Sequence, residues 1–227
     1  MTSAFFANGQ DPVVHGIDTA RGQLEVVHTF ESGPMPTGVS VSHTGRIFVN
    51  FPKWGDEVPA TVVELVNGEA VPFPSAALNQ PRNDADPDAL VSVQSIVVDP
   101  ADRLWILDTG SPMFQPTQHG GPKLVCVNLA TDQVEKTILF DTDVVLPTTY
   151  LNDVRFDLRQ GEAGFAYITD SSDQGPNGII VVDLASGQAW RKLHEHPSTK
   201  AVPLAEMVPM AEGRVSRNAA RVSQRNK

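Results

Sequence analysis

The chain has 227 residues, of which 41% are hydrophobic and 19% are charged, and its formal net charge is −10. This length and composition fit a single folded domain with a substantial apolar core. The acidic charge argues against nucleic acid as a partner, because phosphate binding requires a basic surface, and no stretch approaches the roughly 18 apolar residues of a membrane span. No sustained helical period occurs, so we expect little helix.

Residues 1–36 are expected to form an N-terminal segment with one weak strand, GQLEVVHTF at residues 22–30. This strand would either be the outer strand of the first sheet or close a ring of sheets. The first residues, MTSAFFANGQDP, lack the charged region and the long apolar run of a secretory signal. For the chain as given, we therefore expect a cytoplasmic location.

One hairpin pattern then occurs three times. Residues 37–50, 92–110 and 152–170 each contain an apolar run, a polar turn and a second apolar run. Each copy precedes a second hairpin, and the tips of these second hairpins are Asn67-Gly68, Thr131-Asp132 and Ser186-Gly187. Four strands in roughly 50–60 residues, repeated along the chain, are typical of the blades of a β-propeller.

We therefore predict an all-β fold of about three four-stranded propeller blades in residues 37–193, at about 37–74, 92–140 and 151–193. Residues 194–227 are expected to be a linker and a disordered basic tail. Closed propellers have typically four to eight blades, so three blades would form an open arc. The chain is then either truncated or associates with copies of itself through the exposed edges of its end blades.

Several residues within these repeats are expected to have structural roles. Asp108 and Asp170 end the second apolar run of their copies, 62 residues apart, and this repetition indicates that they cap loop amides. Asp99 and Asp157 are expected to be turn residues. Cys126 lies between two valines, a pattern that indicates a small core residue rather than a nucleophile.

Several motifs in a fixed order resemble one family. The motifs GRIFVNFPKW, LWILDTG, PKLV, LND and AYITDSS lie between about Gly38 and about Gly213. In this order they resemble the major royal jelly protein and Yellow family, in particular its bacterial branch. The resemblance implies a six-bladed β-propeller, of which this chain corresponds to the N-terminal half. It also implies secretion, which is usual among members.

The resemblance implies more than one function. Yellow-type members take part in melanin chemistry, including dopachrome conversion, some salivary members bind biogenic amines, and bacterial relatives are grouped with gluconolactonase-like propellers. We expect small-molecule binding or metal-assisted, gluconolactonase-like hydrolysis at the mouth of the central channel. The alternatives are a dopachrome tautomerase-like isomerase, a non-catalytic amine-binding or secreted protein, and an inactive truncated remnant.

Polar residues that open successive inner strands are expected to face this channel and bind the ligand. They are Thr37 in the first blade, Gln94 and Ser95 in the second, and Asn152 and Asp153 in the third. Carboxylate and amide oxygens suit Ca²⁺, and the resembling lactonase-type propellers hold a divalent ion in such a ring. Asn152 and Asp153 are therefore the predicted ligands of Ca²⁺ or another divalent cation. Alternatively, Asp153 hydrogen-bonds backbone amides of a neighbouring blade.

Asp153 is also the predicted catalytic residue. In a lactonase it would be a metal ligand or the base that activates water. In a tautomerase, Asp153 or a histidine in the channel would remove a proton next to a carbonyl group. The sequence has no phosphate-binding glycine loop, so no organic cofactor is expected.

Aromatic residues between the strands could form the walls of a pocket for a flat cationic or phenolic ligand. They are Phe51, Trp54, Phe114 and Tyr150. Packing between blades is the alternative role for these rings. Trp105 and Tyr167 lie within strands instead, so we expect both of them in the core.

Overall fold

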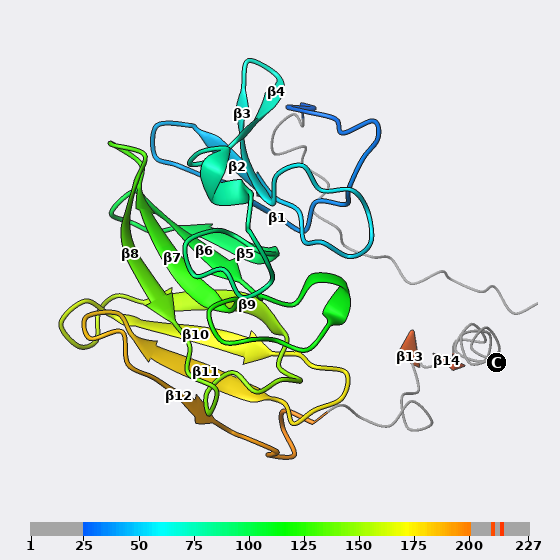
Figure 1. Ribbon diagram of the computed structural model, residues 1–227, viewed down its shortest axis with the longest axis vertical. Coiled ribbons are helices and arrows are strands. Elements are labelled where there is room, and N and C mark those ends of the chain that lie inside the picture. Colours follow the sequence, from blue (N-terminus) through cyan, green and yellow to red (C-terminus); the bar gives the residue numbers. More distant parts are fainter. Residues whose placement is uncertain (1–24, 201–209, 212–213, 216–227) are drawn as a thin grey trace, which may run out of the picture. The chain divides into compact units, whose positions relative to one another are not determined.

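The computed structural model describes residues 25–200, 210–211 and 214–215 of the chain (Figure 1). The chain divides into two compact units, residues 1–31 and 32–227. In the first unit, residues 25–31 have an irregular backbone, and residues 22–24 of the expected strand lie outside the described residues. Of the expected linker and basic tail at residues 194–227, residues 201–209, 212–213 and 216–227 also lie outside them. Every strand of the described residues belongs to the second unit.

Twelve of these strands form three four-stranded antiparallel sheets, each in chain order. The first sheet contains β1 (Gly38–Val41), β2 (Ile47–Asn50), β3 (Val62–Val66) and β4 (Glu69–Pro72). The second contains β5 (Val93–Val98), β6 (Arg103–Asp108), β7 (Lys123–Asn128) and β8 (Gln133–Leu139). The third contains β9 (Leu151–Asp157), β10 (Phe165–Asp170), β11 (Gly178–Asp183) and β12 (Ala189–Lys192).

The remaining elements are short. Two 3₁₀ turns, η1 (Ala77–Asn79) and η2 (Pro112–Phe114), lie in loops, and β13 (Met210–Ala211) pairs with β14 (Arg214–Val215). Within the described part of the chain, no helix is long and apolar enough to cross a membrane. The predicted all-β fold with little helix is therefore confirmed.

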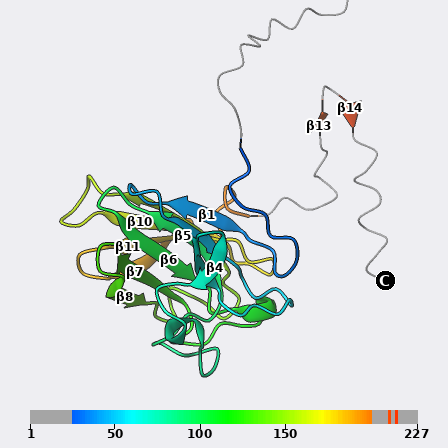
Figure 2. The same ribbon diagram turned by 90° about the horizontal axis from the view of Figure 1, so that it is seen from above.

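The three sheets are arranged as neighbouring blades of a propeller (Figure 1). The first strand of each sheet contacts the first strand of the next, β1 with β5 and β5 with β9. Figure 2 shows the same sheets from above. The described residues form three blades and no closed ring.

The second blade is buried on both faces, and its sequence explains why. Side chains alternate between the faces of a strand, so Leu104 and Ile106 of β6 pack on the first blade, whereas Trp105 and Leu107 pack on the third. A strand that is covered on both faces has a continuous run of apolar residues, and β6 has such a run, LWIL, at residues 104–107. The prediction that Trp105 is a core residue is confirmed.

Tyr167 is different, and the prediction that it belongs to the core was wrong. Its neighbours in β10, Ala166 and Ile168, are buried against the second blade. Tyr167 therefore points to the opposite face of the third blade, where it is 40% exposed. The corresponding outer face of the first blade exposes Val39 and Val41.

Cys126 of β7 is a core residue, as predicted. Its side chain is 1% exposed and packs in the cluster between the second and third blades. Burial raises the pKa of the thiol to about 12. The sulfur therefore stays protonated at neutral pH, and a protonated thiol is a poor nucleophile.

The two aspartates that repeat in register both cap loop amides, as predicted. Asp108 accepts hydrogen bonds from the backbone nitrogens of Val91 (2.6 Å), Ser92 (2.9 Å) and Gly110 (3.0 Å). Each aspartate also faces a buried cation, which the sequence did not predict. The ion pairs are Asp108–Lys123 at 3.2 Å and Asp170–Arg191 at 2.9 Å.

Asp99 does more than form a turn. Its carboxylate accepts the backbone nitrogens of Ala101 and Arg103 at the hairpin tip, as a turn residue does. It also accepts the indole nitrogen of Trp105 at 2.9 Å and pairs with the Arg103 guanidinium at 2.6 Å. Asp99 thereby satisfies the one polar group of a large core side chain.

Candidate functional site

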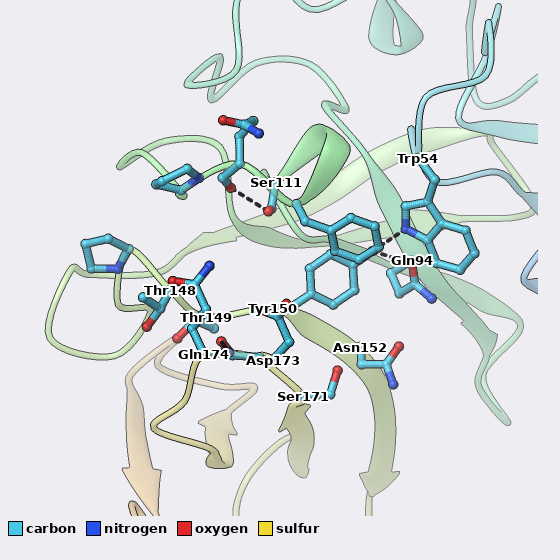
Figure 3. A pocket seen from close by; sticks show the side chains of 15 residues that line it. Trp54, Gln94, Ser111, Thr148, Thr149, Tyr150, Asn152, Ser171, Asp173 and Gln174 are labelled. Carbon is cyan, nitrogen blue, oxygen red and sulfur yellow. Dashed lines mark hydrogen bonds between the residues drawn. The ribbon is translucent and has the colours of Figure 1, made fainter. Parts of the chain in front are cut away.

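A cavity of about 360 Å³ lies where loops from the three blades converge (Figure 3). The first blade contributes Trp54 from the loop after β2. The second contributes Gln94 of β5, together with Ser111 and residues 114–116 of the loop after β6. The third contributes residues 147–150 before β9, Asn152, and residues 171–174 after β10. The cavity is therefore built from the same end of all three sheets.

Three aromatic rings form one wall of this cavity (Figure 3). The Phe114 ring contacts the other two, with its centroid 5.9 Å from that of Trp54 and 5.0 Å from that of Tyr150. Its plane is inclined by 20° to that of Trp54 and by 33° to that of Tyr150, so it stacks on the first ring and is tilted against the second. Phe114 is nevertheless 57% exposed. The sequence predicted these loop aromatics as pocket walls, and the structure brings three of them together.

The loop that carries Phe114 has an unusual backbone. Met113 and Phe114 both have positive φ angles, 52° and 58°, in a region that costs a non-glycine residue of order 1–3 kcal/mol. The backbone nitrogen of Met113 donates to the Lys53 carbonyl oxygen at 2.7 Å. This bond ties the loop of the second blade to the first blade, next to Trp54.

A hydrogen-bonded chain joins the three blades behind the rings. The indole nitrogen of Trp54 donates to the Tyr150 hydroxyl at 2.7 Å, and this hydroxyl donates to Oε1 of Gln94 at 2.8 Å. Tyr150 is 7% exposed. Burial raises the pKa of its phenol, and the Trp54 hydrogen bond only partly offsets this. The phenol is therefore protonated at neutral pH and can donate.

Hydroxyl, amide and carboxylate groups line the rest of the cavity. They belong to Ser111, Gln115, Thr148, Thr149, Asn152, Ser171, Ser172, Asp173 and Gln174. Asp173 is the one carboxylate among the lining residues. Thr148 and Asp173 were not predicted from the sequence, because polar residues in loops are too common to indicate a site.

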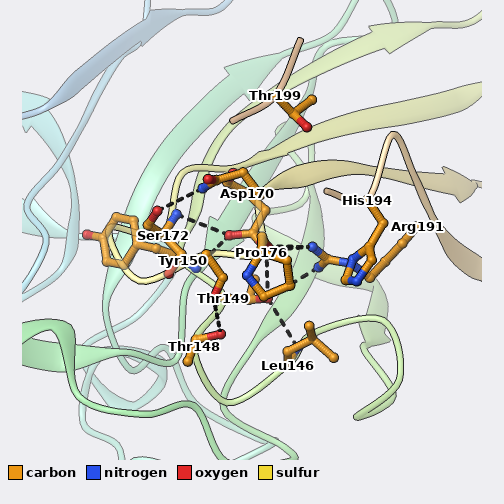
Figure 4. A network of polar contacts seen from close by, with 12 residues as sticks. Leu146, Thr148, Thr149, Tyr150, Asp170, Ser172, Pro176, Arg191, His194 and Thr199 are labelled. Carbon is orange, nitrogen blue, oxygen red and sulfur yellow. Dashed lines mark hydrogen bonds and ion pairs between the residues drawn. The ribbon is translucent and has the colours of Figure 1, made fainter. Parts of the chain in front are cut away.

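A buried polar network holds the two loops of the third blade in place (Figure 4). Asp170 accepts hydrogen bonds from the Tyr150 nitrogen (3.1 Å), the Thr149 hydroxyl (2.8 Å) and the Ser172 nitrogen (3.2 Å). Arg191 pairs with the same carboxylate and donates to the Pro176 carbonyl oxygen at 3.1 Å. The ion pair therefore fixes the two segments, residues 147–150 and 171–174, that line the cavity with polar groups.

Some of the predicted channel residues line the cavity and others do not. Gln94 and Asn152 line it. Ser95 and Asp153 do not, and the Ser95 hydroxyl donates to the Asp153 carboxylate at 2.9 Å. This separation follows from the alternation of side chains along a strand. Thr37 does not line the cavity, but its hydroxyl donates to the backbone oxygen of Gln94 at 3.1 Å.

Phe51 does not belong to the aromatic wall. It is buried, and its backbone nitrogen donates to the Thr61 carbonyl oxygen. The cavity is lined instead by its near neighbour Trp54.

The predicted calcium ligands do not converge on one point. Asn152 lines the cavity, and Asp153 accepts the Ser95 hydroxyl, the Val154 nitrogen and the Arg155 guanidinium, the last at 2.7 Å. A cationic partner competes with a metal ion for this carboxylate. Among the described residues, no three His, Cys, Asp or Glu side chains gather in a way that could hold a metal. The calcium site and the catalytic role of Asp153 stay predictions.

The fold and the cavity define an all-β, propeller-type protein with a cavity between its blades. A family profile described as Major royal jelly protein matches residues 91–222. The chain therefore belongs to the major royal jelly protein family, as its motifs indicated.

Similar proteins include a dopaminechrome tautomerase and several proteins named yellow. The chain is 26% identical over 166 residues to a dopaminechrome tautomerase of Drosophila melanogaster, covering 69% of this chain and 35% of the relative. It is 29% identical over 164 residues to the protein yellow of Drosophila subobscura, covering 67% and 28%. The protein yellow of Drosophila melanogaster matches with 29% identity over 165 residues, covering 67% and 29%. The chain thus spans about a third of the length of these relatives.

Proposed function

We propose that this chain binds a small planar aromatic molecule in the cavity between its blades. The observation that carries the proposal is the wall of three contacting aromatic rings, of which Phe114 keeps more than half of its surface exposed. A volume of about 360 Å³ falls in the range of small-molecule sites, which is roughly 300–1,000 Å³. Polar groups opposite the rings would fix the orientation of such a ligand.

Indane, a flat bicyclic hydrocarbon, is the probe for this proposal. We expect indane to bind to the wild-type chain and Phe114→Ala to weaken its affinity about five- to tenfold, because the variant loses an aromatic contact of about 0.5–1.5 kcal/mol and apolar area. Isothermal titration calorimetry measures the dissociation constant of indane for the wild-type chain and for the variant. Met113→Ala is the matched control, because Met113 is equally exposed on the same loop but does not line the cavity. Equal loss of affinity in both variants would contradict the proposal.

A second candidate function is tautomerisation of the bound ring. It has the support of the similarity to a relative named dopaminechrome tautomerase and of Asp173, a carboxylate at the cavity. In such a reaction Asp173 would accept a proton from a ring carbon, and the resulting carboxylic acid would return it to the oxygen of the enolate. Metal-assisted hydrolysis has less support, because Asp153 is paired with Arg155.

The tautomerase candidate is tested with dopaminechrome, whose loss is followed by its visible absorbance. We expect Asp173→Asn to lower the rate about 10²- to 10⁴-fold, the usual contribution of a general base, while indane still binds. Asp143→Asn is the control, since Asp143 is exposed on a neighbouring loop and does not line the cavity. A wild-type chain that binds indane without accelerating the reaction would leave binding as the function and exclude the tautomerase.

A further inference from the structure

The hydrogen bonds behind the aromatic wall have a fixed direction. An indole nitrogen can only donate, so the Tyr150 hydroxyl accepts from Trp54 and has its own hydrogen left to donate. Its remaining partner among the described residues is the side-chain amide of Gln94, 2.8 Å away. If the amide were turned over, the phenolic hydrogen would face an NH₂ group and have no acceptor in the described part of the chain. Leaving a buried donor unpaired costs about 1–3 kcal/mol.

This direction determines which end of the Gln94 amide faces the cavity. Oε1 is held by Tyr150, so the NH₂ group is the free end, and it makes no hydrogen bond with any described residue. Gln94 is only 8% exposed and lines the cavity. The one fully buried side-chain atom without a partner among the described residues is Oδ1 of Asn50. The Gln94 nitrogen is therefore not sealed inside the protein, and it belongs to a side chain that lines the cavity (Figure 3).

The backbone of Gln94 is held as firmly as its side chain. Its carbonyl oxygen accepts the Thr37 hydroxyl at 3.1 Å, and Thr37 in turn accepts the Asn50 amide at 2.8 Å. The Asn50 amide also donates to the Val93 carbonyl oxygen at 3.0 Å. Both ends of the residue are thus fixed before a ligand arrives, so a ligand that uses this donor need not order it.

We propose that Gln94 selects, among planar aromatic molecules, those that carry a hydrogen-bond acceptor such as a carbonyl oxygen at the ring edge. Trp54 and Tyr150 are the positioning residues, because they hold the amide with its NH₂ group toward the ligand. A ligand without an acceptor leaves the nearly buried Gln94 NH₂ group without a hydrogen-bond partner, and sites of this kind discriminate strongly against such ligands. The inference rests on the proposed aromatic pocket and adds the chemistry of the ligand that fits it.

The test compares 1-indanone with indane, two rings of similar shape of which the first carries one carbonyl oxygen. We expect the wild-type chain to bind 1-indanone about five- to tenfold more tightly than indane. The ratio of the two affinities should fall to about one in Gln94→Leu and in Gln94→Glu. The glutamate variant keeps an acceptor for Tyr150 and lacks the NH₂ group, so it also serves if the leucine variant does not fold.

The positioning residues are tested by the same ratio. Trp54→Phe removes the indole donor, and Tyr150→Phe removes the hydroxyl, so in both variants the amide can turn over and the ratio should fall. Loss of stacking alone would weaken both ligands and leave the ratio unchanged. Gln133→Leu, an exposed glutamine outside the cavity, is the control that should keep the wild-type ratio.

A spectroscopic readout accompanies the affinities. In ¹⁵N-labelled protein, the side-chain NH₂ signals of Gln94, assigned by their loss in Gln94→Leu, should shift with 1-indanone and much less with indane. Equal affinity of the wild-type chain for the two ligands, or a preference that survives in both Gln94 variants, overturns the role of Gln94 while the aromatic pocket stands. If neither ligand binds, the aromatic pocket is wrong and this inference falls with it.

Discussion

Replacing Asp170 with asparagine is expected to lower the free energy of unfolding by about 3–5 kcal/mol, because it leaves the Arg191 guanidinium buried without a counter-charge. The side chain of Asp170 is fully buried, and that of Arg191 is 7% exposed. The same carboxylate accepts the Tyr150 nitrogen, the Thr149 hydroxyl and the Ser172 nitrogen. An amide has one acceptor oxygen, so it cannot serve these donors and the guanidinium at once.

Urea unfolding followed by circular dichroism measures this loss. Asp157→Asn is the matched control, because Asp157 ends β9 of the same blade but pairs with Arg159, whose side chain is 86% exposed. Exposed pairs contribute about 0–1 kcal/mol, so the control should unfold near the wild-type midpoint. Similar midpoints for the two variants would show that the buried pair does not hold the third blade together.

The sequence predicted the carboxylates of the buried pairs but not their cations. Asp108 and Asp170 end equivalent strands of successive blades, so their repetition was visible along the chain. Lys123 lies directly opposite Asp108 in the register of β6 and β7, but the loop of residues 109–122 hides this pairing in the sequence. Arg191 reaches Asp170 from β12, beyond β11, and no local pattern indicates such a contact.

The blades were predictable because their signal is local. Apolar runs alternate with turns, and a strand covered on both faces, such as β6, is apolar throughout. The burial of a particular face is a property of neighbouring sheets instead. Tyr167 therefore could not be assigned correctly from β10 alone, since its outward position depends on which blades flank the third one.

The candidate site was also predicted only in part. Trp54, Phe114 and Tyr150 were identified because they lie in loops between predicted strands, and they meet at the cavity. The predicted ring of channel ligands divides because Gln94 and Ser95, like Asn152 and Asp153, are adjacent in a strand and point in different directions. The alternation of side chains along a strand can be inferred from the sequence. The hydrogen bonds between residues of different blades, such as Tyr150 with Gln94, depend on how the blades pack.

Replacing Lys123 with methionine is the second change for which we expect a large effect, a loss of about 3–5 kcal/mol in the free energy of unfolding. The Lys123 side chain is 1% exposed, and its nitrogen donates to the carbonyl oxygens of Asp86 (3.0 Å), Gly120 (3.2 Å) and Gly121 (2.7 Å). Methionine has a similar length, so it fills the space but leaves these oxygens and the Asp108 carboxylate without their cation.

The control separates the ion pair from the carbonyl contacts. Lys136 also donates to two carbonyl oxygens, those of Leu184 and Ala185 at 2.6 and 2.7 Å, but it is only partly buried, and no carboxylate in the described part of the chain lies within salt-bridge distance of it. Lys136→Met should therefore cost about 1–2 kcal/mol, the value of hydrogen bonds without a buried counter-charge. Combining Lys123→Met with Asp108→Asn should cost less than the sum of the two single changes, by about 0.5–3 kcal/mol. Strict additivity in that cycle would mean that Asp108 is stabilised by its three backbone amides alone, and that the buried charge of Lys123 serves the carbonyl oxygens rather than the carboxylate.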